Sequence, residues 1–141
     1  MEEIIYLNMV GMERNHWWYK GRKEIIGKLV KPYLRPDMKI LDAGCDAGGT
    51  MEYMSKYGSE VGVDISGEMV EHCRNIGLNV LHESVLCLPF GDRSFDLVLC
   101  LDVLEHLSEE KPVLEEFKKG GSAGGNPGSQ RAGLQLALRP A

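Results

Sequence analysis

Short apolar runs alternate with amphipathic stretches through the middle of the chain. The runs predicted to be strands are Ile40–Ala43, Glu60–Asp64, Asn79–Glu83 and Phe95–Leu101. The last of them, FDLVLCL, is almost continuously apolar, which is typical of a strand buried on both faces of a sheet. Predicted helices follow the first, second and fourth of these strands, at residues 50–57, at residues 66–77 and at residues 102–119, the last interrupted near Ser108. Strands that alternate with helices predict an α/β fold with a parallel sheet and right-handed crossovers.

Residues 1–37 form a predicted N-terminal helical lid. Apolar side chains recur there near the helical period, at Trp18, Ile25, Ile26, Leu29, Val30 and Tyr33. Pro32 and Pro36 end the element. We expect an amphipathic helix that packs its aromatic side chains on the sheet. A second interpretation brings Tyr19 and Arg22 over the following turn, where the guanidinium would offer a fork to a ligand carboxylate.

The composition changes abruptly after Lys119. Residues 120–141 contain six glycines and no acidic residue, which is typical of a flexible linker or a non-native tail. Within them, only Leu134–Leu138 alternates as a strand would. The chain is therefore divided into the lid, an α/β half-domain over residues 38–119, and this tail.

The charge balance bounds the partners and the compartment. The 16 Lys and Arg residues and 21 Asp and Glu residues give a net charge of −5, so no nucleic-acid partner is expected. No apolar run approaches the roughly 20 residues of a membrane-spanning helix, so no membrane partner is expected. The N-terminus is acidic where a signal peptide would be basic. The four cysteines lack metal-ligand spacing, so we expect free thiols in a reducing cytoplasm and no metal site.

The most informative stretch is MKILDAGCDAGGT, residues 38–50. A predicted strand ends there on Asp42 and breaks into Gly44 and Gly48 before a helix. Glycine permits positive φ and close ligand approach, and the helix N-terminus presents unpaired N–H groups to the same place. Asp64 follows Gly44 by 20 residues, the spacing at which an acid ending the second strand meets a ribose. This spacing alone also suits NAD.

A larger set of motifs resembles one family. ILDAGCDAGG, VGVDIS, LPFGDRSFDLV and VLEHL, with the leader HWWYKGRKEII, resemble class I S-adenosylmethionine-dependent methyltransferases of the type 11 kind over about residues 14 to 118. The resemblance implies a Rossmann-like three-layer sandwich with strand order 3-2-1-4-5-7-6. It implies S-adenosylmethionine as cofactor, S-adenosylhomocysteine as product and an unidentified small-molecule acceptor.

The resemblance also implies roles for individual residues. The turn residues Asp42, Gly44, Cys45, Asp46 and Gly48 would cradle the methionine end of the cofactor. The remaining implied contacts are Asp64 with the ribose hydroxyls, Ile65 and Met69 with the adenine, Ser84 and Val85 with the adenine edge, and the Leu101 carbonyl with the methionine ammonium.

Two positions depart from the family pattern. Asp46 occupies the place of the middle glycine in D-x-G-x-G-x-G, where a side chain narrows the turn and adds a charge near the ligand carboxylate. Ser84 occupies the place of an aspartate, which removes a charge-assisted acceptor for the adenine amino group. Both departures are expected to weaken cofactor binding.

The catalytic candidates follow the fourth predicted strand. Methyl transfer from a sulfonium requires mainly positioning and, for some nucleophiles, a base. Glu105 and His106 are the candidates for such a base, and with Asp102 they resemble an arrangement of some metal-assisted methyltransferases. The alternative is that His106 caps a helix or packs, as VLEHL occurs in enzymes of many specificities.

The length of the chain shapes the last expectations. The strands implied beyond Lys119 are absent from the predicted pattern, so we expect a cofactor-binding fragment without full activity. Two alternatives are an NAD-binding or nucleotide-binding Rossmann-like module and an inactive, self-associating fragment. Truncation would leave Phe95–Leu101 as an apolar edge strand, which natural proteins avoid. We expect a homodimer through that edge or, alternatively, Leu134–Leu138 covering it as a surrogate strand.

Overall fold

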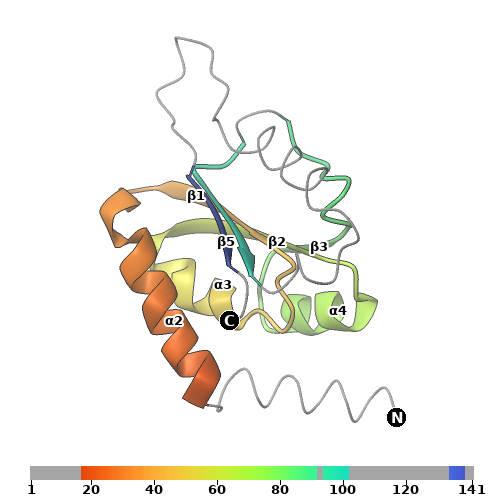
Figure 1. Cartoon of the computed structure of the whole chain (residues 1–141). Coiled ribbons are helices and arrows are strands. Elements are labelled where there is room, and N and C mark those ends of the chain that lie inside the picture. The colour runs from red at the N-terminus through yellow and green to blue at the C-terminus, as the bar shows by residue number, and fades with distance from the viewer. Residues whose placement is uncertain (1–16, 92–93, 102–133, 139–141) are drawn as a thin grey trace.

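The computed structural model describes residues 17–91, 94–101 and 134–138 (Figure 1). Its elements are helix α2 (Trp17–Val30), 3₁₀ turn η1 (Lys31–Tyr33), β1 (Met38–Ala43), α3 (Gly49–Met54), 3₁₀ turn η2 (Ser55–Tyr57), β2 (Gly58–Asp64), α4 (Gly67–Asn75), β3 (Val80–His82), β4 (Leu97–Leu101) and β5 (Leu134–Leu138). The strands form one sheet in the order β3-β2-β1-β4-β5. Every neighbouring pair is parallel. The predicted α/β fold with a parallel sheet is therefore confirmed.

Helix α4 begins and ends where its sequence predicts. The Ser66 side chain accepts a hydrogen bond from the Met69 N–H and so caps the N-terminus. Gly77 has a φ of 89° and its N–H donates to the Arg74 carbonyl, as expected of a helix terminator. The other predicted elements agree within a few residues, and the predicted helix over residues 102–119 lies outside the described residues.

Strand β5 corrects two expectations about the C-terminal stretch. It pairs with β4 along its whole length, from Leu97↔Leu134 to Leu101↔Leu138. Residues 134–138 are therefore not linker, and the surrogate strand is the arrangement found. The expectation that β4 is an edge strand is wrong, because β1 and β5 flank it. The premise for a dimer through that edge is lost with it.

The sheet separates two apolar layers. Helices α2, α3 and α4 lie on one face (Figure 1), and side chains of alternate parity fill the two sides. Under α2 and α3 the core consists of Ile26, Val30, Met38, Ile40, Met54, Leu97, Leu99 and Leu101. The opposite core consists of Leu41, Ala43, Val63, Val85, Phe95, Val98 and Cys100. Strands with both faces buried explain why β4 is apolar throughout.

The expectation that α2 packs its aromatic side chains on the sheet fails for Trp17, the α2 aromatic whose side chain the structure describes. Ile26 and Val30 are fully buried and anchor the helix, whereas Trp17, Ile25, Leu29 and Tyr33 are exposed. Apolar residues at successive positions point in directions about 100° apart. Only one of the two apolar lines on this helix can therefore face the core.

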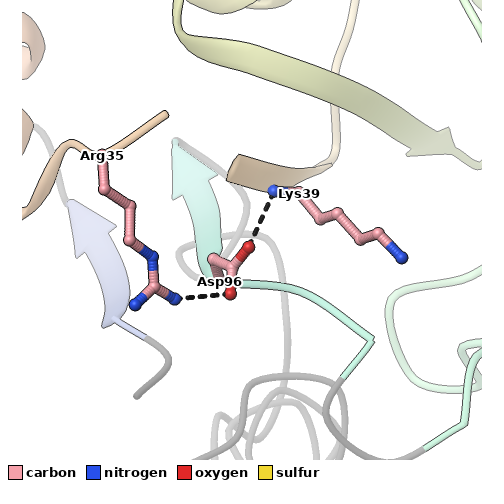
Figure 2. A network of polar contacts seen from close by, with 3 residues as sticks. All are labelled: Arg35, Lys39 and Asp96. Carbon is pink, nitrogen blue, oxygen red and sulfur yellow. Dashed lines mark hydrogen bonds and ion pairs between the residues drawn. The ribbon is translucent and has the colours of Figure 1, made fainter. Parts of the chain in front are cut away.

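A buried carboxylate ties the start of β1 to the start of β4. Asp96 accepts a hydrogen bond from the Arg35 guanidinium at 2.6 Å and from the Lys39 backbone N–H at 2.9 Å (Figure 2). The Asp96 N–H donates in return to the Lys39 carbonyl at 2.7 Å. This network lies at the amino end of the central strands, opposite the glycine turn, and fixes the segment that leads from α2 into the sheet.

Within the described part of the chain, no helix is both long and apolar enough to cross a membrane.

Candidate functional site

The carboxyl ends of β1, β2 and β4 meet at the glycine turn. Gly44, Asp46 and Gly48 all have positive φ, at 79°, 46° and 83°. The N–H groups of Gly44 and Cys45 donate to the Val63 carbonyl, at 2.8 and 3.1 Å. The turn is thereby folded over the end of β2. Because the neighbours of β1 are β2 on one side and β4 on the other, this is the switch point at which open α/β sheets bind ligands.

Asp64 holds the two loops of this site together. Its Oδ2 accepts the Asp46 N–H at 2.9 Å, and its Oδ1 accepts the Ser66 N–H at 2.8 Å. The side chain is only 7% exposed. A carboxylate has about four acceptor positions, so two remain after these bonds. Asp64 can therefore shape both loops and still accept two hydroxyl groups.

The electrostatic potential at the turn is negative. The pKa of the buried Cys45 thiol is raised by its hydrogen bond with Cys73, by burial, and by the negative charges of Asp42 and Asp64. The thiol thus remains protonated. Asp42 is itself 2% exposed at the end of β1. Two nearly buried carboxylates within electrostatic range of one turn residue favour a cationic ligand group over an anionic one.

Cys73 was not predicted as part of this site. Its thiol donates to the Asp46 carbonyl at 3.2 Å and so supports the turn from α4. Nothing in the spacing of the cysteines indicates this contact, because it joins residues 27 positions apart. Gly48 is also placed by packing: a Cβ there would lie 2.4 Å from Leu78 Cδ1. The glycine lets the turn pack against residues that follow α4.

The loop after β2 is fixed from β3. His82 lies beside Asp64 in the register of the two strands. Its Nε2 lies 2.8 Å from the Ile65 carbonyl oxygen, which accepts the hydrogen bond. The Ile65 side chain is 76% exposed. An apolar side chain is thereby exposed next to Asp64, the residue predicted to bind the ribose. The position of His82 at the end of a predicted strand could have indicated that it holds this loop.

The other predicted cofactor contacts have mixed surroundings. Ser84 accepts the Leu86 N–H at 3.1 Å through its hydroxyl and so shapes a turn. Val85 and Met69 are buried, and Val85 packs in the core opposite α2. Leu101 ends β4 one residue beyond Cys100, which pairs with Ala43. The roles of these four residues toward a ligand stay predictions.

Several predicted site residues stay predictions. Glu105 and His106 lie outside the described residues, as does Asp102. Arg22 lies in α2, and so does Tyr19, whose side chain is not described. Among the described residues, no group of three or more His, Cys, Asp or Glu side chains could hold a metal ion.

A parallel α/β sheet with a glycine turn and an acid at the end of β2 defines a Rossmann-like, nucleoside-binding class of protein. Residues 41–126 match the family described as methyltransferase domain, of the type 11 kind. This match covers more than half of the chain, which therefore belongs to that family.

Named relatives agree with this assignment. The chain is 30% identical over 95 residues to a ubiquinone biosynthesis O-methyltransferase of Methylococcus capsulatus, a match that covers 62% of this chain and 40% of the relative. It is 33% identical over 111 residues to phosphoethanolamine N-methyltransferase 1 of Zea mays, covering 73% of this chain and 22% of the relative. The chain thus spans less than half the length of these curated relatives.

Solved structures share the fold. The YcgJ protein of Bacillus subtilis superposes with a TM-score of 0.61 at 29% identity, over 67% of this chain and 44% of that protein. A SAM-dependent methyltransferase of Aquifex aeolicus gives 0.57 at 30% identity, over 66% and 56%. A Methanococcus maripaludis protein described as a methyltransferase gives 0.72 at 16% identity, over 82% and 57%, which supports the fold alone.

Proposed function

We propose that this chain binds S-adenosylmethionine and takes part in methyl transfer to a small-molecule acceptor, with S-adenosylhomocysteine as product. The observation that carries the proposal is Asp64, a nearly buried carboxylate with two acceptor positions left at the end of β2. These positions suit the two hydroxyls of a ribose. When bound, the cofactor supplies a methyl group that its sulfonium already activates.

The electrostatics of the turn favour this cofactor over NAD. Asp42 and Asp64 both raise the pKa of Cys45, and the side chain of Asp46 lies in the same turn. A pyrophosphate would meet these carboxylates at close range, whereas a sulfonium and an ammonium would be stabilised by them. Helix α3 behind the turn has only six residues. It therefore offers a pyrophosphate little compensation.

The chain's own residues would bind and orient rather than activate the donor. Displacement at a sulfonium methyl is governed by alignment of the nucleophile, so the turn and Asp64 would contribute by positioning. A base for the acceptor is still predicted to be Glu105 or His106. Cofactor binding is the part of the reaction assigned to the described residues.

The acceptor class and the compartment are also proposed. The names of two relatives refer to small molecules, one to ubiquinone biosynthesis and the other to phosphoethanolamine. The net charge of −5 disfavours a nucleic-acid acceptor. All four cysteines are free thiols, which supports a reducing, cytoplasmic environment.

The test measures discrimination between adenosine and 2′,3′-dideoxyadenosine by calorimetry. The wild-type chain should prefer adenosine, because only adenosine presents hydroxyls to Asp64. In Asp64→Ala the preference should disappear, a loss of about 1.5–3 kcal/mol for hydrogen bonds to a charged group. S-adenosylhomocysteine and NAD, titrated alongside, distinguish the two cofactor classes.

A matched control separates recognition from collapse of the turn. Ser66→Ala keeps the hydrogen bond from the backbone N–H of residue 66 to Asp64 and removes only the side-chain cap of α4. This variant should therefore keep the preference for adenosine. If Asp64→Ala lowers the affinity for both nucleosides by the same factor, the preference for adenosine is retained. A retained preference would show that Asp64 does not bind the ribose.

A further inference from the structure

Helix α2 carries a line of apolar side chains on its exposed side. Ile25 and Leu29 are four residues apart and lie about 40° from each other around the helix, and Trp17 lies about two turns before Ile25 and about 80° from it. Tyr33 continues the spacing in η1. Their exposed fractions are 75%, 58%, 44% and 54%, respectively. Large apolar groups are thus exposed at the last three of these turns, at Ile25, Leu29 and Tyr33, and such a patch marks an interaction site more often than single exposed residues do.

Basic side chains border this apolar line. Lys20, Glu24 and Lys28 form the neighbouring exposed line of α2, and Lys31 follows in η1. Residues 17–39 contain seven basic and two acidic residues, a net charge of +5. The described residues from 40 to 101 contain two basic and nine acidic residues, a net charge of −7. Of these charges, Arg35 is paired with Asp96 and Lys39 lies in β1. The exposed apolar line itself is bordered by Lys20, Lys28 and Lys31 against Glu24.

We propose that this α2 surface, formed by Trp17, Lys20, Ile25, Lys28, Leu29, Lys31 and Tyr33, docks on the surface of an anionic phospholipid membrane. An amphipathic helix of this kind lies in the plane of the interface, with its apolar line among the upper acyl chains and its lysines at the headgroups. The opposite side of α2, with Ile26 and Val30, stays anchored in the protein core.

The charges and side-chain types decide against the other occupants. A second copy related by a two-fold axis would bring the lysines of two such surfaces, Lys20, Lys28 and Lys31, against each other. A nucleic acid would satisfy the lysines but leave Ile25 and Leu29 in water. An anionic bilayer contacts both the basic and the apolar line.

The finding that no helix among the described residues could span a membrane does not oppose this docking. The expectation of no membrane partner came from the length of the apolar runs. Surface binding requires one apolar side of a helix and complementary charge, and it does not require a continuous apolar segment. The proposal also stands independently of methyl transfer.

The test uses gain and loss of vesicle binding by the full chain. Gly21 lies on the apolar line, and an added Cβ there meets nothing within 4 Å. Gly21→Leu should therefore strengthen sedimentation with vesicles of about three parts phosphatidylcholine to one part phosphatidylglycerol, by about fivefold or more. Leu29→Ser should weaken it by a similar factor. Glu24→Lys should strengthen it, because it raises the net charge of the surface by two.

Matched substitutions outside the surface serve as controls. Gly91→Leu places a leucine at an exposed glycine outside the surface, whose added Cβ would have only Ser94 Oγ within 4 Å, at 4.0 Å. Leu86→Ser changes a leucine that is 48% exposed, close to the 44% of Leu29. Both should bind vesicles as the wild type does. Vesicles of phosphatidylcholine alone, or about 0.5 M salt, should abolish most of the binding.

Three results would overturn the proposal. The first is equal binding of wild type, Gly21→Leu and Leu29→Ser to the anionic vesicles. The second is heparin binding that Leu29→Ser leaves unchanged, together with no vesicle binding, which would identify a polyanion site. The third is a change of molecular mass on light scattering for these variants without vesicles, which would identify an interface between copies of the chain.

Discussion

Two nearly buried aspartates lie at opposite ends of the sheet, and they differ in what neutralises them. Asp96, at the amino end, is 3% exposed and receives the Arg35 guanidinium together with the Lys39 N–H (Figure 2). Asp64, at the carboxyl end, is 7% exposed and receives two backbone N–H groups. Within the described residues, no cation pairs with it.

This difference separates a structural carboxylate from one suited to a ligand. A charge that the fold already pairs has little to gain from a ligand, and its removal leaves a cation and a donor unmatched. A carboxylate held only by backbone N–H groups is fixed in position and still has free acceptor positions for a ligand. Glu60 supplies a third case on β2: its Oε1 is buried without a hydrogen-bond partner among the described residues.

The largest expected effect is on stability at the amino end. Asp96→Ala leaves Arg35 and the Lys39 N–H without their acceptor, so the free energy of unfolding should fall by about 2–3 kcal/mol. Urea denaturation measures it, with Asp96→Asn as a milder control that keeps one acceptor. A loss below about 0.5 kcal/mol would mean that the network contributes no more than a surface contact.

The next prediction separates ligand binding from stability. S-adenosylhomocysteine at about 100 times its Kd should stabilise the wild type by about 2.7 kcal/mol in thermal or urea unfolding. Asp96→Asn should keep this increment, whereas Asp64→Asn should lose most of it. Loss of the increment in Asp96→Asn, with the increment retained in Asp64→Asn, would reverse the proposed roles of the two ends.

Glu60 tests what a carboxyl does without either kind of partner. Burial raises its pKa from 4.5 to about 8, so the folded state keeps a proton that the unfolded state releases between these values. Wild-type stability should therefore fall as pH rises from about 4.5 to about 8. Glu60→Gln should remove this contribution and be more stable by about 1–2 kcal/mol at pH 8.5, since partial exposure screens the charge.

The control for this prediction is the low-pH limit. Near pH 4.5 the side chain at position 60 is uncharged in the folded wild type and in the glutamine variant. The two proteins should therefore have similar free energies of unfolding. A difference that stays constant from pH 4.5 to 8.5 would show that packing, and not titration, separates them.

The smallest expected effect concerns Asp46. Its φ of 46° lies in the left-handed region, which costs a non-glycine residue roughly 1 kcal/mol. Asp46→Gly should stabilise the fold by up to that amount and also tighten S-adenosylhomocysteine binding, because it removes a carboxylate from the turn. Asp46→Asn is the matched control, as it removes the charge and keeps the side chain. Weaker binding by the glycine variant would mean that Asp46 assists the ligand.

The sequence alone predicted the local features of this protein. These features depend on contacts within a few residues or on the periodicity of apolar residues. They are strands β1 to β4, the Ser66 cap, the Gly77 stop and the glycine turn followed by Asp64. Such features are encoded where they occur. The methyltransferase family, too, was identified from short motifs on these elements.

Only the tertiary structure decided the contacts between distant segments. Leu134–Leu138 pairs with β4, Arg35 meets Asp96 across 61 positions, and Cys73 supports the turn at Asp46. The same holds for α2, which carries two similar apolar lines in its sequence. In the structure, the sheet buries Ile26 and Val30 and leaves Ile25 and Leu29 exposed. Which line is buried depends on the position of the sheet, because periodicity specifies the lines of a helix and not the partner that covers one of them.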